Sequence, residues 1–247
     1  MNPQFNIQAV WGPRRETPDA LANRFLNLLD RLSSIDPVFR NWTWVARGGR
    51  TAQFEAIKNR LPAEIEAAIS RDDYGKPSPI YGYRFSIINS MKFQPRFVSI
   101  RFDVGSWSVT DHYANSAVLE TAYNLKPDPA LVAYRIFKPA LLALAECFDA
   151  TWCSAYSHAT MQYWNEGLGE HYRLAWISYI GPRFAHLVTP PASAIVEREP
   201  NGGLLMAATD ETFDVSNPAH LAAARDILAA VAPLNALPWP PEVHAPD

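Results

Sequence analysis

The stretch FVSIRFDV, from Phe97 to Val104, alternates between apolar and polar side chains and is followed by the dipeptide Gly105-Ser106. Alternate side chains of a strand point to opposite faces of a sheet. From Val98 onward, one face would therefore carry Val98, Ile100, Phe102 and Val104, and the other would carry Ser99, Arg101 and Asp103. This pattern predicts an antiparallel sheet with one solvated face. The glycine turn predicts that residues 107–112 pair back as a hairpin.

Similar patterns outside this stretch predict the other elements. Strands are expected at residues 5–11, 42–46, 83–89, 152–157 and 174–180, and a hairpin at 194–198 and 204–208 around the turn PNGG. Helices are expected after the Thr17-Pro18 cap, at 51–59, at 62–71, at 128–148 with a kink or restart at Pro139, and from 216–218 to about 232. The apolar stripe of the first helix is Leu21, Phe25, Leu28, Leu29 and Leu32.

These elements predict an α+β fold with mixed, mainly antiparallel sheets and flanking helices. A chain of 247 residues fits one domain. Each half also contains a helix, strands with hairpin turns, and a helix. An alternative organisation is therefore two similar lobes, about 1–127 and 128–247, that share the long central helix.

Composition excludes several classes of function. The net charge of −3 and the pI of about 6.1 lack the basic footprint of a nucleic-acid-binding protein. No stretch approaches the roughly 18 apolar residues of a membrane span, and the N-terminal residues do not resemble a signal peptide. We therefore expect a cytoplasmic protein, in which Cys147 and Cys153 are buried, reduced and inert.

Catalytic motifs are missing from the sequence. It contains no Walker loop, GxSxG or HExxH pattern, and Glu197 and Glu199 share a strand face without a nearby lysine. The best metal candidate is Glu166, Glu170 and His171, with His158 as a further ligand. Gly167 and Gly169 oppose the helix that this spacing requires, so a solvated loop is favoured over a metal site. We expect no cofactor and no catalytic site.

Two segments carry candidate binding residues. Asp210, Glu211 and Asp214 precede the last helix, either as carboxylates favoured at a helix start or as an acidic patch for a basic partner. His220, in the first turn of that helix, is expected on the surface. Trp164 lies among polar neighbours and is the first choice for an exposed aromatic anchor, because aromatic residues dominate binding hot spots.

The two ends of the chain resemble the immunity protein 52 family. The resemblance rests on VWGPRRET, with Trp11, Gly12 and Arg14, on DPVFRNWTW, and on the GGLL…TDETFD…NP block from Gly202 to Pro218. These pieces bracket nearly the whole chain. For most of the motif positions the resemblance implies a role in maintaining the fold, with glycines in turns and Trp11 and Phe213 in packing.

The resemblance implies a cytoplasmic antidote that binds and neutralises a cognate toxin of the type VI secretion system, with a restriction-endonuclease-like toxin domain. The expected contact residues are Trp164, Glu166, Glu170, Asp210, Glu211 and Asp214. Two other hypotheses stay open: a hydrolase or nuclease with an unrecognised site, and a sensor that binds a small ligand in an aromatic pocket between lobes.

Overall fold

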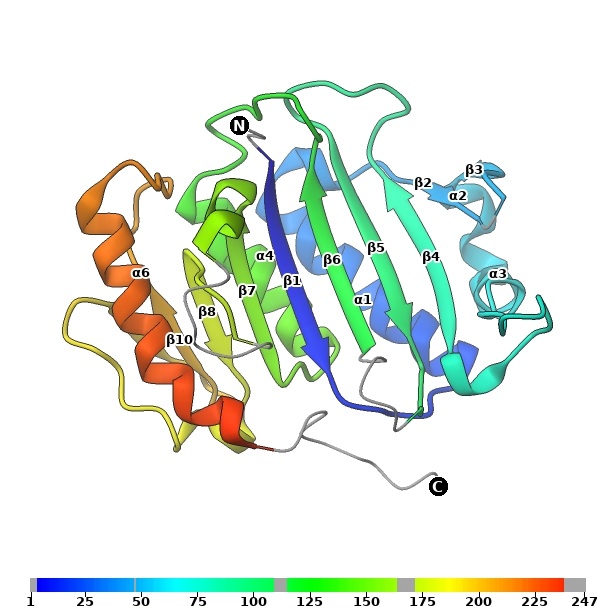
Figure 1. The fold of residues 1–247 in the computed structure, drawn as a ribbon. Coiled ribbons are helices and arrows are strands. Elements are labelled where there is room, and N and C mark those ends of the chain that lie inside the picture. The colour runs from blue at the N-terminus through cyan, green and yellow to red at the C-terminus, as the bar shows by residue number, and fades with distance from the viewer. Residues whose placement is uncertain (1–3, 47, 109–114, 164–171, 238–247) are drawn as a thin grey trace.

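A computed structural model describes residues 4–46, 48–108, 115–163 and 172–237. The strands of this part form one ten-stranded sheet in the order β3-β2-β4-β5-β6-β1-β7-β8-β10-β9, and every neighbouring pair is antiparallel (Figure 1). The strands are β1 Phe5–Trp11, β2 Thr43–Val45, β3 Thr51–Gln53, β4 Tyr83–Ile88, β5 Val98–Val104, β6 Asn115–Thr121, β7 Trp152–Ser157, β8 Ile177–Ile180, β9 Ile195–Arg198 and β10 Leu204–Ala207. This architecture confirms the predicted α+β class.

The helices lie on both faces of the sheet. Figure 1 shows α1 and α4 together behind the central strands, and α6 in front of β10. The α-helices are α1 Pro18–Ile35, α2 Phe54–Ile57, α3 Leu61–Ala67, α4 Tyr134–Cys147, α5 Pro182–Ala185 and α6 Pro218–Val231. The 3-10 turns are η1 Pro37–Phe39, η2 Lys58–Arg60, η3 Pro79–Tyr81, η4 His158–Tyr163 and η5 Ala232–Ala236. None of these helices is long and apolar enough to span a membrane.

Helix α1 begins where its capping residues predict. Thr17 Oγ1 accepts a hydrogen bond of 3.2 Å from the backbone nitrogen of Ala20, and Pro18 occupies the first turn. The cap satisfies one of the backbone N–H groups that a helix start leaves without a partner. The whole predicted apolar stripe is buried against the core.

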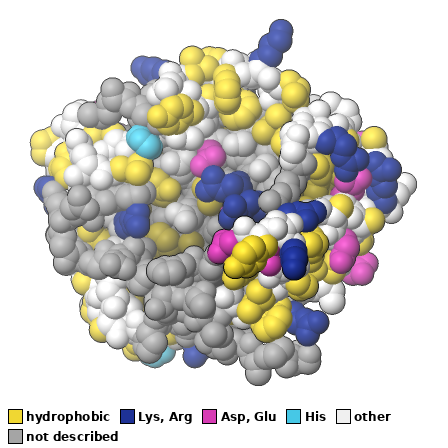
Figure 2. Space-filling view, turned by 45° about the vertical axis from the view of Figure 1, so that its right-hand side comes forward, with side chains coloured by type: hydrophobic (Ala, Val, Ile, Leu, Met, Phe, Trp, Pro, Cys, Tyr) yellow, Lys and Arg dark blue, Asp and Glu magenta, His cyan; other side chains and the backbone are white. Residues whose placement is uncertain are grey.

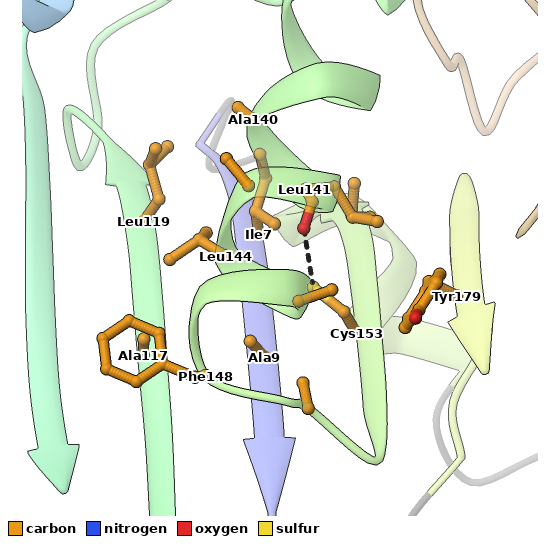
Figure 3. Packing of buried hydrophobic residues seen from close by; sticks show 14 of the residues in the cluster. Ile7, Ala9, Ala117, Leu119, Ala140, Leu141, Leu144, Phe148, Cys153 and Tyr179 are labelled. Atoms are coloured by element: carbon orange, nitrogen blue, oxygen red, sulfur yellow. Dashed lines mark hydrogen bonds between the residues drawn. The ribbon is translucent and has the colours of Figure 1, made fainter. Parts of the chain in front are cut away.

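The main core lies between the sheet and the α1–α4 pair. Figure 3 shows Leu141 and Leu144 of α4 next to Ile7, Ala9 and Cys153 of the central strands. The small residues of β1 and β7 let the helix approach closely, and Cys153 Sγ lies 3.7 Å from the carbonyl oxygen of Leu141. Close packing of this kind makes the core intolerant of volume changes.

The opposite face of β4, β5 and β6 is the solvated face that the alternation predicted. Along β5, the apolar residues are buried, while Ser99, Arg101 and Asp103 are at least partly exposed. Arg101 lies 3.7 Å from Asp103 and 4.0 Å from Glu120, so the charges on this face largely pair with each other. The face in Figure 2 accordingly shows basic side chains near its middle with acidic ones beside them.

The chain pairs back on β5 as an antiparallel neighbour, but the return strand does not begin at residue 107 as predicted. The strand that pairs with β5 on this side is β6, which begins only at Asn115, and residues 109–114 lie outside the described part. Asn115 closes this longer connection, since its side chain is fully buried and bonds the backbone N–H and carbonyl of Ser106 at 2.8 and 2.9 Å. The turn signal of Gly105-Ser106 therefore placed the start of the return strand too early.

Two helix predictions also need correction. The helix expected at 128–148 begins at Tyr134 and continues through Pro139, so of the kink or restart expected there the restart is wrong. The Asp128-Pro129 pair starts a separate turn instead, in which Leu131 N bonds Asp128 O at 2.9 Å. The helix expected at 51–59 starts at Phe54, because residues 51–53 form the edge strand β3.

The two halves of the chain share the sheet. Residues before 127 supply β1 to β6, and residues after 128 supply β7 to β10, with β1 and β7 paired at the junction. The hairpin predicted around PNGG is confirmed as β9 and β10, with Ala207 opposite Ile195 and Leu204 opposite Arg198. Whether the halves behave as two lobes stays a prediction.

Candidate functional site

Several connections gather at one end of the sheet, where β1 begins and β6 and β10 end (Figure 1). They enclose a hollow of about 340 Å³ that opens to solvent. Most of its lining is apolar, and polar groups lie at a few points. The lining residues are Phe5, Lys126, Pro127, Pro129, Val132, Ser157, Ala159, Thr212, Phe213, Asp214 and Val215.

The predicted acidic residues lie on the segment that borders this hollow. Asp210, Glu211 and Asp214 are all exposed on the connection between β10 and α6. Thr212 holds this connection in place, because its Oγ1 donates a hydrogen bond of 3.1 Å to the carbonyl oxygen of Val132. The structure thus places Asp214 in the lining of an apolar hollow, with Asp210 and Glu211 exposed just before the lining residues on the same connection.

Asp214 also has a local structural role. One of its carboxylate oxygens, Oδ1, accepts hydrogen bonds of 2.8 Å from both the backbone nitrogen and the hydroxyl of Ser216. These bonds, the backbone one first, lower the pKa of Asp214 below its ordinary value. The helix cap itself is Asn217, whose Oδ1 accepts a bond of 3.0 Å from Ala219 N. For Asp214 the helix-entry interpretation therefore holds alongside any binding role.

His220 is buried, so the expected surface position is wrong. Its side chain stacks on Phe213 with ring centroids 5.9 Å apart, and Nδ1 accepts a 3.2 Å hydrogen bond from Asp214 N. Its Nε2 lies 3.6 Å from Glu211 Oε2. The buried histidine thus holds the acidic segment in place. Its position in the first turn of the last helix did not reveal this burial.

The other predicted contact residues cannot be placed. Trp164, Glu166 and Glu170, together with His171 of the metal candidate, lie outside the described residues. His158 is described and is half-buried in η4, with its ring 6.4 Å from that of Tyr123. Among the described residues, no three His, Cys, Asp or Glu side chains lie close enough together to hold a metal ion.

Glu197 does have a lysine partner, although none follows it in sequence. Lys138 Nζ, from α4, forms an ion pair with Glu197 Oε2 on the edge strand β9. Tyr134 lies one turn earlier on α4, and burial, with the nearby charge of Glu197, raises its pKa to about 12. Burial also raises the pKa of Glu199. The ion pair joins α4 to the edge of the sheet. The pattern of strand β9 could not reveal it, because the lysine lies on a helix far away in sequence.

The opposite end of the sheet holds a second cavity, of about 800 Å³, that includes Arg14 and Arg24. Each arginine donates a hydrogen bond to a backbone carbonyl at the end of α4 and forms an ion pair with Glu16. Arg24 Nε pairs with Glu16 at 2.8 Å and Nη1 donates to the carbonyl oxygen of Cys147 at 2.8 Å, while Arg14 Nη2 donates to that of Phe148 at 2.9 Å. Cations are favoured at a helix C-terminus, where carbonyl groups lack partners. This cluster fastens the end of α4.

Comparisons with known proteins agree with this architecture. The profile of the family described as Immunity protein 52 matches residues 4–235. A solved structure, the Pseudomonas aeruginosa T6SS protein PA0821, superposes with a TM-score of 0.52 at 12% identity, covering 93% of this chain and 73% of that chain. No curated protein matches the sequence. The solved structure is too distant in sequence to show more than a shared fold.

The ten-stranded sheet, its helices and the hollow beside the acidic segment define an α+β protein with a candidate binding site on its described surface. Because the family profile covers nearly the whole sequence, the chain belongs to the immunity protein 52 family. Its role is that of an immunity protein. The motif positions have the structural roles expected of them: Trp11 and Phe213 are buried, and Gly202 adopts a positive φ of 89° in the hairpin turn.

Most lining residues of the hollow escaped the sequence analysis. Phe5 at the start of β1, Pro127 and Val132 on the connection between β6 and α4, and Ala159 in η4 belong to three separate segments of the chain. No motif or period links them, because only the strand order brings their segments together. The sequence did reveal the acidic segment beside the hollow, since a run of exposed carboxylates is visible without the fold.

Proposed function

We propose that this chain neutralises a nuclease-like toxin of the type VI secretion system in the cytoplasm, by binding it and without catalysis. The proposal rests on membership of the immunity protein 52 family. The described fold is shared with a protein named as a T6SS protein, which is consistent with it. The contact surface would include the segment of Asp210, Glu211 and Asp214, together with Trp164, Glu166 and Glu170.

Charge supports the choice of this surface. A nuclease presents a basic cleft to its substrate, and an inhibitor with an opposing acidic surface gains association rate and specificity. The net charge of −3 is too small to steer a partner by itself, so the local cluster must do so. Asp210 and Glu211 are exposed next to an apolar hollow, which is the combination of polar rim and apolar centre typical of interfaces.

Co-expression with the toxin encoded by the neighbouring gene tests the proposal. Wild-type protein should restore growth. The double variant Asp210→Lys with Glu211→Lys should bind at least about tenfold more weakly, mainly through a slower association rate. The matched control is Asp30→Lys with Glu66→Lys, which reverses two exposed charges on α1 and α3. If the wild-type protein neither binds this toxin nor protects cells from it, the proposed function is wrong.

A further inference from the structure

We propose that the hollow beside the acidic segment receives one large apolar side chain of the toxin, presented next to basic residues. This inference rests on the proposed function and names the part of the toxin that the site recognises. The hollow of about 340 Å³ lies at the small end of the range for ligand pockets, which suits an inserted side chain better than a cofactor.

The floor of the hollow is apolar and held by the core. Phe213 and Val132 are each only 3% exposed, and Phe213 stacks on His220. Phe5 packs edge-on against Phe137 of α4, with ring centroids 6.0 Å apart. An apolar side chain that enters the hollow moves from water onto a surface of aromatic and aliphatic carbon. This burial of apolar surface is the favourable step in most protein association.

The walls of the hollow are fixed before any partner arrives. Thr212 bonds the carbonyl of Val132 across the hollow at 3.1 Å. On the other side, Asp128 N donates to Pro95 O at 2.8 Å, and Arg96 pairs with the Asp128 carboxylate at 2.8 Å. Binding to a preformed site loses little conformational entropy, so the contact can be strong for its size.

The charges at the mouth select the kind of partner. Asp214 lines the hollow, and Asp210 and Glu211 precede it on the same exposed segment, whereas Lys126 is the single basic residue in the lining. A partner with basic residues beside its apolar anchor would satisfy these carboxylates. A second copy of this chain, related by a twofold axis, would bring like charges together, which disfavours self-association here.

The test changes the hollow through two of its lining residues, Ala159 and the partly buried Val215. Ala159→Trp places a large side chain in it from η4, and Val215→Arg adds a cation at its wall. The matched controls are Ala56→Trp on α2 and Val196→Arg on β9, where Ala56 is exposed and Val196 is 40% exposed. Thermal unfolding establishes that each variant is folded, and titration with the purified toxin encoded by the neighbouring gene gives the affinity.

We expect the wild-type protein and both controls to bind alike, and the two hollow variants to bind at least about 30-fold more weakly, as for a hot-spot contact. Folded hollow variants that bind within about threefold of wild type overturn this inference and leave the proposed function standing. If the wild-type protein does not bind the toxin, the proposed function itself is wrong. Sedimentation is a second readout: a wild-type dimer that Ala159→Trp dissociates would show that a second copy fills the hollow.

Discussion

Arg14 donates a hydrogen bond of 2.9 Å from Nη2 to the backbone carbonyl oxygen of Phe148, a residue 134 positions further along the chain. Trp11, three residues earlier, stacks on the ring of Phe148 at a centroid distance of 4.9 Å. The motif at the start of the chain is therefore a clamp on the end of α4. It brings the N-terminal strand and the central helix into one unit.

Replacing Arg14 with alanine should destabilise the protein by about 2–4 kcal/mol. The change removes the bond to Phe148 and one of the two arginines that neutralise Glu16, whose side chain is only 6% exposed. Chemical denaturation of the variant measures the loss. The control is Arg15→Ala, which removes an exposed cation over the ring of Trp107 and should cost less than about 1 kcal/mol. Equal losses of unfolding free energy in both variants would contradict a special stabilising role for the contact between Arg14 and Phe148.

Gly203 should not tolerate alanine while Tyr179 keeps its ring. A Cβ at Gly203 would lie 2.4 Å from Tyr179 Oη, 2.5 Å from its Cε2 and 2.6 Å from its Cζ. Overpacking of this kind costs typically about 1–3 kcal/mol. Tyr179→Leu removes all three atoms, so the double variant should lose less free energy of unfolding than the sum of the single losses. Strict additivity in a double-mutant cycle would show that the Tyr179 ring is not the obstacle.

Acid should weaken the bridge in which Arg96 joins Asp36 and Asp128. The hydrogen bond from Arg96, followed by that from Ala130 N, lowers the pKa of Asp128. Because the folded pKa lies below the unfolded value of about 3.9, the carboxylate stabilises the fold above that value and loses its contribution as the pH falls through the folded pKa.

Denaturation at a series of pH values checks this expectation. Wild-type protein should lose more free energy of unfolding between about pH 5 and pH 2 than Asp128→Asn, which has no carboxylate to protonate at this position. Parallel curves for the two proteins would mean that Asp128 does not contribute to the acid sensitivity. Asp30→Asn, at an exposed position on α1, is the control for a simple change of charge.

The two thiols should resist modification in the native protein. Both cysteines are free and buried, as the sequence predicted. Burial raises the pKa of Cys147 to about 11 and that of Cys153 well above its ordinary value, and the thiolate is the reactive form. A thiol reagent at about pH 8 should therefore react slowly with native protein and rapidly with two groups per chain in denaturant. Fast native reaction would show that the core opens around α4.

Local sequence signals located several elements correctly. The alternation in β5 and the Thr17 cap of α1 each depend on residues within a few positions, and both were found as expected. The return strand expected at 107–112 was misplaced for the opposite reason. The partner of β5 is selected by pairing and by the buried Asn115, which a turn signal does not contain.

The same distinction between local sequence signals and tertiary packing applies to the candidate site. The acidic segment at Asp210, Glu211 and Asp214 is visible as a cluster of charges, so the sequence could propose it. The hollow beside it could not be proposed, because Phe5, Pro127 and Ala159 meet only through the order of β1, β6 and β7 in the sheet. The ion pair of Lys138 and Glu197 is hidden in the same way.

By itself, the sequence determined the α+β class, the solvated face of β5, the buried cysteines and the resemblance to the immunity protein 52 family. These follow from side-chain periodicity, capping and motif, which act over short stretches of chain. Only the tertiary structure decided the single ten-stranded sheet, the clamp between Arg14 and Phe148, the burial of His220 and the hollow. Each of these depends on which distant segments pack together, and that choice is made by burial of the whole core.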